Sequence, residues 1–330
     1  MGHGSGGKMM HDLIKSVFSS AFDNPVLAAS NDAGLVTPQA TDSLAVSTDA
    51  HVVLPLFFPG GDIGKLAVCG TVNDVAMLGA KPEYLTAGFI LEEGLAVETL
   101  ERVVASMAES AKEAGVQIVA GDTKVVERGK ADGMYITTAG IGSVLPDTQI
   151  GGQYARPGDK VIISGTLGDH GIAVLSARGE LGFEADLKSD IAPLNQMIAE
   201  IIAASKHVHV LRDPTRGGLA TSLNEIARQS TVGITVEETR IPVQPVVQSA
   251  CEMLGFDPLY VANEGKLIVI IAPEDADLVL DTIKQNCYGT DASIIGEVTD
   301  EPAGRVLMKT VIGTHRVVDI LTGEMLPRIC

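Results

Sequence analysis

The chain has 330 residues, enough for two domains with complete cores, and its 45% hydrophobic and 20% charged residues are typical of a folded globular protein. Its formal net charge of −18 argues against binding to the phosphate backbone of nucleic acids, although a nucleotide held through a divalent cation stays compatible with it. Aromatic residues make up 4% and tryptophan is absent, so the core must rest on aliphatic side chains and methionine.

The four cysteines, Cys69, Cys251, Cys287 and Cys330, include no Cys-x-x-Cys pair, which argues against a zinc cage or a redox dithiol. They are too sparse for a disulfide scaffold, so a reducing cytoplasm is the expected setting. No apolar run reaches the length of a membrane span, and the N-terminus lacks a basic-then-apolar signal. We therefore expect a cytoplasmic protein.

The N-terminal glycine segment nearly matches two nucleotide-binding fingerprints. Gly2, Gly4 and Gly7 fit the dinucleotide spacing, but no strand can precede them. The run to Lys8 also begins like a P-loop, but Met9 stands where Ser or Thr would bind Mg²⁺. Two interpretations stay open: an arm that folds its N–H groups over phosphates, and a disordered arm that resembles an expression tag.

In the first half of the chain the pattern predicts an amphipathic segment, strands and helices in alternation. The predicted ranges are the amphipathic segment 9–22, strand 44–48 ending in Asp49, helix 63–78, strand 84–91, helix 98–114, strand 116–120 opening into Gly121–Lys124, and strand 134–144. Turn clusters follow, so we place a domain boundary near 148–158. The predicted organisation is an N-terminal domain 1–150, a C-terminal domain 151–320, and a flexible tail 321–330.

The second half continues the same mixture. The predicted elements are strand 161–164, helices 169–178, 191–204 and 219–229, strand 266–272, helix 274–285, and short strands 294–298, 305–311 and 315–319. Because strands and helices are mixed in both halves, the predicted fold class is α+β.

Three acidic residues sit in apolar surroundings. Asp49 and Asp122 follow predicted strands, whereas Asp74 lies in a predicted helix that is otherwise made of small and apolar residues. A carboxylate in such a place is costly unless it is paired or bound to a metal, and Mg²⁺ binds through a few carboxylates plus substrate phosphates. The alternative is that each aspartate only caps a helix or stabilises a turn. We favour a metal–phosphate site, which Asp32 could join, with Lys124 offsetting phosphoryl charge.

Two polar loops in the second half are further candidates. Arg212-Asp213-Pro214-Thr215-Arg216-Gly217-Gly218 leads into a helix and presents N–H groups as an anion site, unless it is an ordinary helix start. Glu264 precedes an apolar strand and is a candidate general base if desolvation raises its pKa; the alternative is a loop carboxylate paired with Lys266. The histidines show no metal-ligand spacing, and Asp169-His170-Gly171 is a candidate helix cap near the cleft.

The last residue of the chain is Cys330. Fully extended, the segment 321–330 could reach roughly 33 Å, enough to carry a thiol into an active site of the same molecule or of a neighbour. The alternative is a frayed terminus that ends in cysteine by chance. The rest of the sequence must decide between the two.

Together these motifs resemble the HypE family of hydrogenase maturation factors, within the AIR-synthetase-like (PurM-like) superfamily of ATP-binding proteins. The resemblance runs nearly end to end and rests on the following stretches: His3–Lys8, Ser47–Asp49, Pro55–Gly61, Asn73–Ala76, Gly121–Val126, Ser164–Gly171, Arg212–Gly218, Ala262–Lys266 and Pro327–Cys330. The acidic and glycine motifs mark the superfamily, and the cysteine-terminated tail marks HypE.

The resemblance implies an N-terminal α+β domain that dimerises through its sheet, a C-terminal α/β domain, and ATP between them. The carbamoyltransferase HypF would place a carbamoyl group on Cys330. ATP would phosphorylate the carboxamide oxygen, and loss of phosphate would leave a thiocyanate. Its cyanide would pass to iron on a HypC–HypD scaffold for a [NiFe]-hydrogenase.

The resemblance also assigns roles to residues. Cys330, Lys124 and Glu264 would be catalytic, with Glu264 taking a proton from the amide nitrogen. Asp32, Asp49, Asp74 and Asp122 would hold Mg²⁺. ATP would be bound by Gly4, Ser5, Gly6, Lys8, Asp49, Asn73, Asp74, Asp122, Thr123, Asp213, Arg216 and Gly217.

Two alternatives stay open. The chain could be another superfamily enzyme, such as selenophosphate synthetase, AIR synthetase or thiamine-monophosphate kinase, none of which needs a terminal cysteine. It could instead be an ATP-sensing scaffold whose tail docks on partners without turnover.

Overall fold

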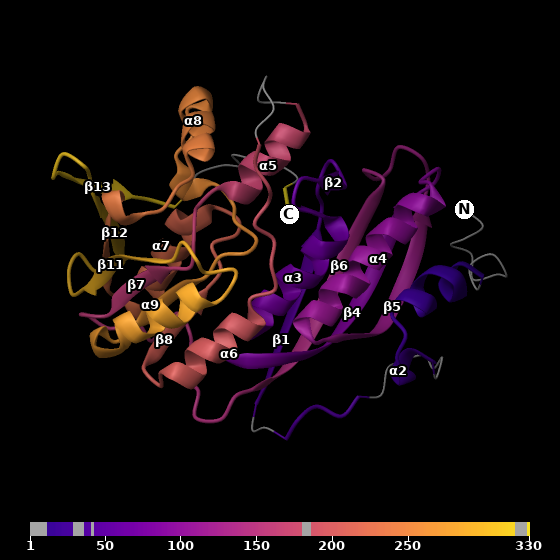
Figure 1. Cartoon of the computed structure of the whole chain (residues 1–330), viewed down its shortest axis with the longest axis horizontal. Helices are drawn as coiled ribbons and strands as arrows, with labels where there is room; N and C mark the ends of the chain where they lie inside the picture. Colours follow the sequence, from indigo (N-terminus) through magenta and orange to yellow (C-terminus); the bar gives the residue numbers. More distant parts are fainter. Residues whose placement is uncertain (1–11, 29–35, 41–42, 180–185, 321–328) are drawn as a thin grey trace.

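The computed structural model describes residues 12–28, 36–40, 43–179, 186–320 and 329–330. Figure 1 shows an N-terminal lobe, in which two helices lie across a sheet, beside a C-terminal lobe coloured pink to yellow. The C-terminus lies between the two lobes, close to α5 and β2. Gly4, Ser5, Gly6, Lys8 and Asp32, which we expected at the nucleotide, lie outside the described residues.

A four-stranded sheet organises the N-terminal lobe. Its strands are, in spatial order, β1 (Leu44–His51), β6 (Met134–Val144), β4 (Ala80–Glu92) and β5 (Gln117–Val126), and only β4 and β5 run parallel among these pairs. The helices α3 (Ile63–Ala76) and α4 (Val97–Ala114) cover one face (Figure 1). The short elements are η2 (Ile14–Ser19), α2 (Pro25–Ala28), β2 (Phe57–Phe58) and β3 (Gly61–Asp62).

The helix α3 forms where the sequence places a capping aspartate before a run of small and apolar residues. Asp62 accepts hydrogen bonds from the backbone N–H groups of Gly64 at 2.7 Å and Lys65 at 3.2 Å, which satisfies donors that the first turn leaves free. A Cβ at Gly64 would lie 2.4 Å from the carbonyl oxygen of Val103, so glycine allows α3 and α4 to pack closely. The helix is apolar nearly all round because it is buried between α4 and the sheet.

A seven-stranded sheet organises the C-terminal lobe. Its order is β13 (His315–Val318), β12 (Arg305–Lys309), β9 (Gly233–Glu237), β11 (Ser293–Thr299), β7 (Lys160–Ile163), β10 (Ile268–Ile271) and β8 (Val208–Arg212), and its pairs are antiparallel except β9 with β12. One face packs against α7 (Gly218–Ser230), the other against α6 (Asn195–Ala204) and α9 (Ala276–Gln285).

The two lobes share part of their core. The helices α5 (Asp169–Ala177) and α8 (Pro245–Leu254) contribute Ile172, Val174 and Val247 to the same hydrophobic cluster as Leu66 of α3. These side chains are almost completely buried. The lobes are therefore fixed against each other by an apolar contact, and the cleft between them has a defined shape.

The expected α+β fold with a C-terminal α/β-type domain is confirmed, and most predicted elements lie within two or three residues of their positions. Two predictions were wrong in a way that matters for the site. Asp49 and Asp122 lie inside β1 and β5 rather than at strand ends, because both strands continue beyond them. The elements β8, β9 and α8 were not predicted. No helix in the described part of the chain is long and apolar enough to cross a membrane.

Candidate active site

A polar cleft of about 490 Å³ opens between the two lobes. From the N-terminal lobe it is lined by β1 and α3, including Ser47 and Asp74; from the C-terminal lobe it is lined by the loop after β8 and the first turns of α7. The end of β8 contributes Arg212, and the loop contributes Asp213 and Arg216. The polar loop predicted as an anion site therefore faces one of the predicted metal carboxylates.

Asp74 of α3 lines the cleft, and the carboxylate of Asp49 on β1 lies close enough to affect it. The Ser47 hydroxyl donates a hydrogen bond to Asp74 Oδ2 at 2.8 Å. Burial raises the pKa of Asp74, the Ser47 hydroxyl opposes this, and the neighbouring negative charge of Asp49 adds to the rise. Asp49 Oδ2 lies 3.7 Å from Nε2 of His51, a buried histidine whose pKa is lowered by burial. A cation would relieve the repulsion between these carboxylates.

The opposite wall is the loop 212–218 and the start of α7. Gly217 has a left-handed backbone (φ 77°), and a Cβ there would lie 2.2 Å from Thr221 Oγ1, so only glycine fits this turn. Thr221 Oγ1 is buried without a hydrogen-bond partner among the described residues. The exposed Arg216, the N–H groups of the helix start and this hydroxyl form a site suited to phosphate oxygens.

Asp213 stands at the centre of the charge cluster. Burial and, second, the charge of Asp74 raise the pKa of Asp213 to about 7, while Arg212 opposes the rise. Arg212 is also paired with Glu225 of α7. The lining of the cleft thus includes the carboxylates of Asp74, Asp213 and Glu225 and the guanidinium groups of Arg212 and Arg216. This combination can hold a metal–phosphate complex.

Glu264 lies at the back of this cluster. Its side chain is 5% exposed, and Oε1 has no hydrogen-bond partner within the described part of the chain. Burial raises its pKa well above the ordinary value, and Asp213 adds to the effect. A desolvated carboxylate of this kind is a strong proton acceptor. The alternative pairing with Lys266 is wrong, because Lys266 Nζ lies 3.3 Å from Asp190 and 3.8 Å from Asp169 instead.

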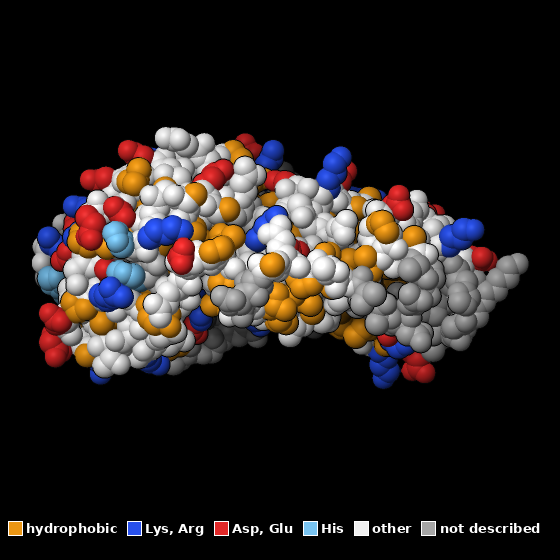
Figure 2. Space-filling view, turned by 90° about the horizontal axis from the view of Figure 1, so that it is seen from below, with side chains coloured by type: hydrophobic (Ala, Val, Ile, Leu, Met, Phe, Trp, Pro, Cys, Tyr) orange, Lys and Arg blue, Asp and Glu red, His pale blue; other side chains and the backbone are white. Residues whose placement is uncertain are grey.

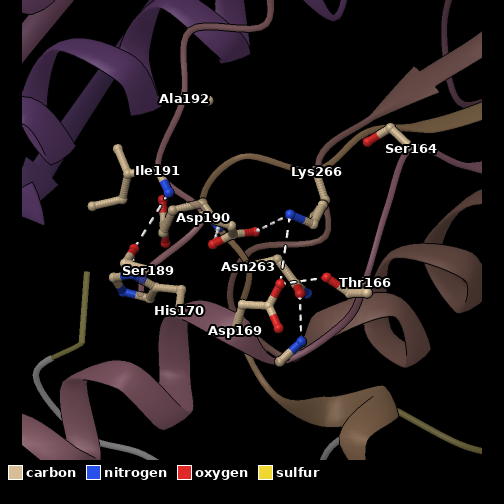
Figure 3. Close-up of polar contacts among 12 residues, drawn as sticks. Ser164, Thr166, Asp169, His170, Ser189, Asp190, Ile191, Ala192, Asn263 and Lys266 are labelled. Carbon is tan, nitrogen blue, oxygen red and sulfur yellow. Dashed lines mark hydrogen bonds and ion pairs between the residues drawn. The ribbon is translucent and has the colours of Figure 1, made fainter. Parts of the chain in front are cut away.

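A buried network that includes Asp190 holds the backbone at Glu264, and Figure 3 shows the side chains of Lys266, Asp169 and Asp190 in it. Lys266 lies between the carboxylates of Asp169 and Asp190, and Asp169 Oδ2 also accepts a hydrogen bond from Thr166 at 2.5 Å. Asp190 Oδ1 accepts the backbone N–H of Glu264 at 3.1 Å. The sequence did not single out Asp190, since its neighbours read as an ordinary loop; no local signal marks it.

Asn73, which we expected to bind ATP, has a structural role in this chain. Its amide donates to the carbonyl of Ala192 at 3.0 Å and accepts the N–H of Leu194 at 2.8 Å, and it lies 3.5 Å from the carbonyl oxygen of Glu264. It is 2% exposed. Its amide therefore joins α3 to two segments of the C-terminal lobe.

The structure does not bring Asp122, Thr123 and Lys124 into this cleft. They lie on β5, at the opposite edge of the sheet from β1. Thr123 is buried, whereas Asp122 and Lys124 are each 66% exposed and pair with each other at 3.2 Å. The expectation that the three carboxylates meet at one rim is wrong within a single chain.

The described residues form only part of a metal site. No three His, Cys, Asp or Glu side chains surround a common point within the described ranges. Asp49 and Asp74 nevertheless fit Mg²⁺ in kind, because they are neighbouring oxygen donors whose charges repel each other. A metal bound to only two carboxylates would complete its coordination with phosphate oxygens and water.

The last two residues of the tail contact the N-terminal lobe of their own chain. Ile329 forms an antiparallel bridge with Val53, and the N–H of Val52 donates to the carbonyl of Cys330 at 3.1 Å. Val52 directly follows β1, the strand that carries Asp49. The tail residues 321–328, predicted to be flexible, lie outside the described residues.

The fold and the site define an AIR synthase-related protein of the PurM-like type. The family models for the N-terminal and C-terminal domains of AIR synthase related protein match residues 30–144 and 156–309.

Within this class, one group of relatives matches the whole chain. The carbamoyl dehydratase HypE of Cupriavidus necator is 55% identical over 330 residues, which cover 100% of this chain and 94% of the relative. A crystal structure of the hydrogenase maturation protein HypE in complex with ATP is 52% identical and superposes with a TM-score of 0.96 over 100% of this chain and 99% of that one. HypE in a HypE–HypF complex is 50% identical, with a TM-score of 0.82 over 96% of this chain and 100% of that one. This chain belongs to the HypE family.

Proposed function

We propose that this protein is an ATP-dependent carbamoyl dehydratase that acts on its own C-terminal Cys330. The observation that carries the proposal is the cleft lined by Asp213 and Arg216, with the buried carboxyl of Glu264 close enough to Asp213 for that charge to raise its pKa. Among the described residues, Oε1 of Glu264 has no hydrogen-bond partner. The HypE relatives named as carbamoyl dehydratases and the HypE–ATP complex support it.

The proposed reaction has two steps, phosphorylation of the carboxamide and loss of phosphate. The carboxamide oxygen of the S-carbamoyl group attacks the γ-phosphorus of ATP, ADP leaves, and one N–H proton is lost, which gives a phosphorylated imidate. The C–O bond then breaks, phosphate leaves with the carboxamide oxygen, and loss of the second N–H proton gives the thiocyanate. An amide oxygen is a poor leaving group, and phosphorylation corrects that.

Residues of the cleft supply the rest of the chemistry. Glu264 accepts a proton from the amide nitrogen, helped by a raised pKa that makes it a better base. Arg216, the N–H groups after Gly217 and the Thr221 hydroxyl bind phosphate oxygens. Asp49 and Asp74 would hold Mg²⁺, which neutralises phosphate charge when it is bound.

We include Asp122, Thr123 and Lys124 in the site by way of a homodimer. On the face of the sheet turned away from α3, Leu44, Val46 and Ile90 are 50%, 67% and 40% exposed. Figure 2 shows hydrophobic side chains gathered near the middle of the molecule when it is seen from below. An apolar sheet face of this kind is suited to a second copy.

A two-fold axis along the strands would lay β5 of a second copy over β1. Asp122 pairs with Gly88 and points to the exposed face, since its neighbour Thr123 is buried opposite Phe89. Asp122 and Lys124 of the second copy would then approach the edge strand β1 from the exposed face, while Asp49 points from the same strand to the other face. This supports the metal set Asp49, Asp74 and Asp122, with Lys124 at the transferring phosphoryl group.

The partners and setting follow from the same family. We propose HypF as the carbamoyl donor, in line with the HypE–HypF complex, and a HypC–HypD iron scaffold as the acceptor of cyanide for a [NiFe]-hydrogenase. The domains proposed are 1–150 and 151–320, followed by the carrier tail. The free cysteines among the described residues fit a reducing cytoplasm.

Intact-mass measurements test the proposal. The protein is incubated with its carbamoyl-donor system, and MgATP is then added. Cys330 should gain a carbamoyl group and then lose one water. A modification that persists in Cys330→Ala would rule out the tail as carrier, whereas an adduct that ATP never dehydrates would favour the alternative of an ATP-sensing scaffold.

A further inference from the structure

The last two residues of the chain, Ile329 and Cys330, pack against the backbone that follows β1. We call this binding position of the terminal residues the tail seat. Ile329 is 5% exposed and belongs to the main hydrophobic cluster of the N-terminal lobe. Its bridge to Val53 and the bond from Val52 to the Cys330 carbonyl hold one side of the terminal segment. These contacts fix the backbone on one side only.

His170 holds the other side. Its Nε2 lies 2.5 Å from the carbonyl oxygen of Ile329, and its side chain is 0% exposed. A carbonyl oxygen only accepts hydrogen bonds, so Nε2 must carry the proton in this contact. The bond joins residues 159 positions apart, from the first turn of α5 to the residue before the terminal cysteine.

The second ring nitrogen agrees with this protonation state. His170 Nδ1 lies 2.8 Å from Ser189 Oγ, and Ser189 Oγ accepts the N–H of Ile191 at 3.3 Å. If Nε2 carries the proton, Nδ1 of the neutral ring accepts from the Ser189 hydroxyl. One neutral tautomer therefore satisfies all three contacts at once.

Packing restricts the orientation of the ring. Phe58 lies edge-on to the imidazole, with 5.7 Å between ring centroids and an interplanar angle of 80°. The N–H of Ser189 donates to the carbonyl of Pro59 at 2.8 Å, which fixes the serine against the same hairpin. Figure 3 shows Ser189 beside the His170 ring, on the segment that continues into Asp190 and Ile191.

We propose that His170 is a positioning residue that seats the carrier tail by donating a hydrogen bond from Nε2 to the Ile329 carbonyl. The proposal deepens the proposed function and rests on it in one respect, that Cys330 is the carrier. His170 does not touch the reacting group; it fixes the peptide immediately before Cys330 and hence the direction in which the side chain leaves the backbone.

The same segment connects the seat to the proposed base. Ser189 contacts His170, and the adjacent Asp190 holds the backbone N–H of Glu264 at 3.1 Å. A Cβ at Gly265 would lie 1.8 Å from the carbonyl oxygen of Asp190, so the two segments are in direct contact. The tail seat and Glu264 are therefore positioned by consecutive residues of one segment without regular secondary structure, Ser189 and Asp190.

Alkylation of Cys330 tests the seat without any turnover. The full-length protein carries Cys287→Ser, because Cys287 is exposed, whereas Cys69 and Cys251 are buried. The rate is read from the mass of the C-terminal peptide. His170→Phe keeps an aromatic ring but removes the donor, and loss of one such hydrogen bond should raise the alkylation rate roughly tenfold.

Two variants serve as controls. In His170→Gln the amide nitrogen can take the place of Nε2, so the alkylation rate should stay near that of the parent protein. In His209→Phe another largely buried histidine, which lies on β8 and pairs with Asp159 at 2.8 Å, is replaced, and the rate should not change. Parent-like alkylation of His170→Phe would overturn the proposal, and so would His170→Gln alkylating as fast as His170→Phe.

A measurement on the unchanged protein covers the case in which His170→Phe does not fold. The ring nitrogen shifts of His170 at neutral pH should show a neutral imidazole protonated at Nε2; protonation at Nδ1 alone would overturn the proposal. Neither readout requires ATP or a carbamoyl donor. A failure of the dehydration reaction therefore leaves the seat testable, and a failure of the seat leaves the dehydration assay unaffected.

Discussion

Asp49 and Asp122 lie on opposite edge strands of the N-terminal sheet and point to opposite faces. Asp49 points toward α3, where its Oδ2 would lie 3.3 Å from a Cβ placed at Gly70. Asp122 pairs with Gly88 and is exposed on the other face. Two β-strands lie between them, which corresponds to about 14 Å across the sheet. One chain cannot place both carboxylates on one metal ion.

Mixing two inactive variants therefore separates action within a chain from action between chains. We expect Asp74→Asn and Asp122→Asn to be inactive alone. In a mixed dimer one site carries both changes and the other is intact, so remixed subunits should recover about a quarter of the parent ATPase activity.

The control is each variant unfolded and refolded alone, which should stay inactive. If the mixture is as inactive as its components although mixed dimers form, Asp122 does not act across the dimer.

Replacement of the proposed base should separate chemistry from binding. Glu264→Gln keeps the size of the buried side chain and removes its ability to accept a proton. We expect dehydration of the carbamoylated tail to slow by roughly 10²–10⁴-fold, while ATP affinity changes little. Single-turnover mass spectrometry gives the rate, and calorimetric titration gives the affinity. Unchanged dehydration in Glu264→Gln would assign the proton transfer to another group.

Removal of the exposed guanidinium in the cleft should weaken nucleotide binding. Arg216→Ala loses a charged donor to phosphate oxygens, and the Kd for ATP should rise roughly tenfold to a hundredfold. The matched control is Arg316→Ala, whose side chain pairs with Asp257 on the surface of the C-terminal lobe. Equal ATP affinities of the two variants would place the phosphates elsewhere.

The stability of the protein should depend on pH through Asp213. The pKa of Asp213 is raised from 3.8 to about 7, chiefly by burial. Between these values the folded protein keeps a proton that the unfolded chain has released, so stability falls as the pH rises through this window. Asp213→Asn is neutral in both states. At about pH 8 it should be more stable than the parent protein by roughly 1–3 kcal/mol, less than the full shift because the cleft is partly solvated.

Denaturant unfolding at about pH 4 and pH 8 measures this difference. The gain should disappear at the lower pH, where Asp213 is protonated in the folded protein. Asp169, with a pKa raised to about 6, acts in the same direction, so Asp169→Asn as background separates the two groups. A gain of equal size at both pH values would assign the effect to packing instead.

Local sequence patterns were sufficient to predict much of the fold and part of the site. The helix after Asp62 and the glycine turn at Gly217 follow from capping and backbone rules that need no tertiary information. Glu264 was recognised as a candidate base because it precedes an apolar strand, and its burial bears out the condition set for it.

The rest depends on the pairing of segments far apart in the chain. The order of strands decides that Asp122 lies away from Asp49, and no local spacing reveals that order. The family resemblance implied that Asn73 binds ATP, but its amide bonds to a segment about 120 residues away. Asp190 and Ser189 have no local signal, since their function arises from contacts with α5 and the loop at Glu264.

The fate of the carboxamide oxygen tests the central claim most directly. The tail is carbamoylated with an oxygen-18-labelled carboxamide, and one turnover is started with MgATP. If ATP activates the carboxamide by phosphorylation, the label should appear in inorganic phosphate, and the C-terminal peptide should carry a cyano group on Cys330. Label that is recovered in water, or that stays on the peptide while ATP is hydrolysed, would contradict the account.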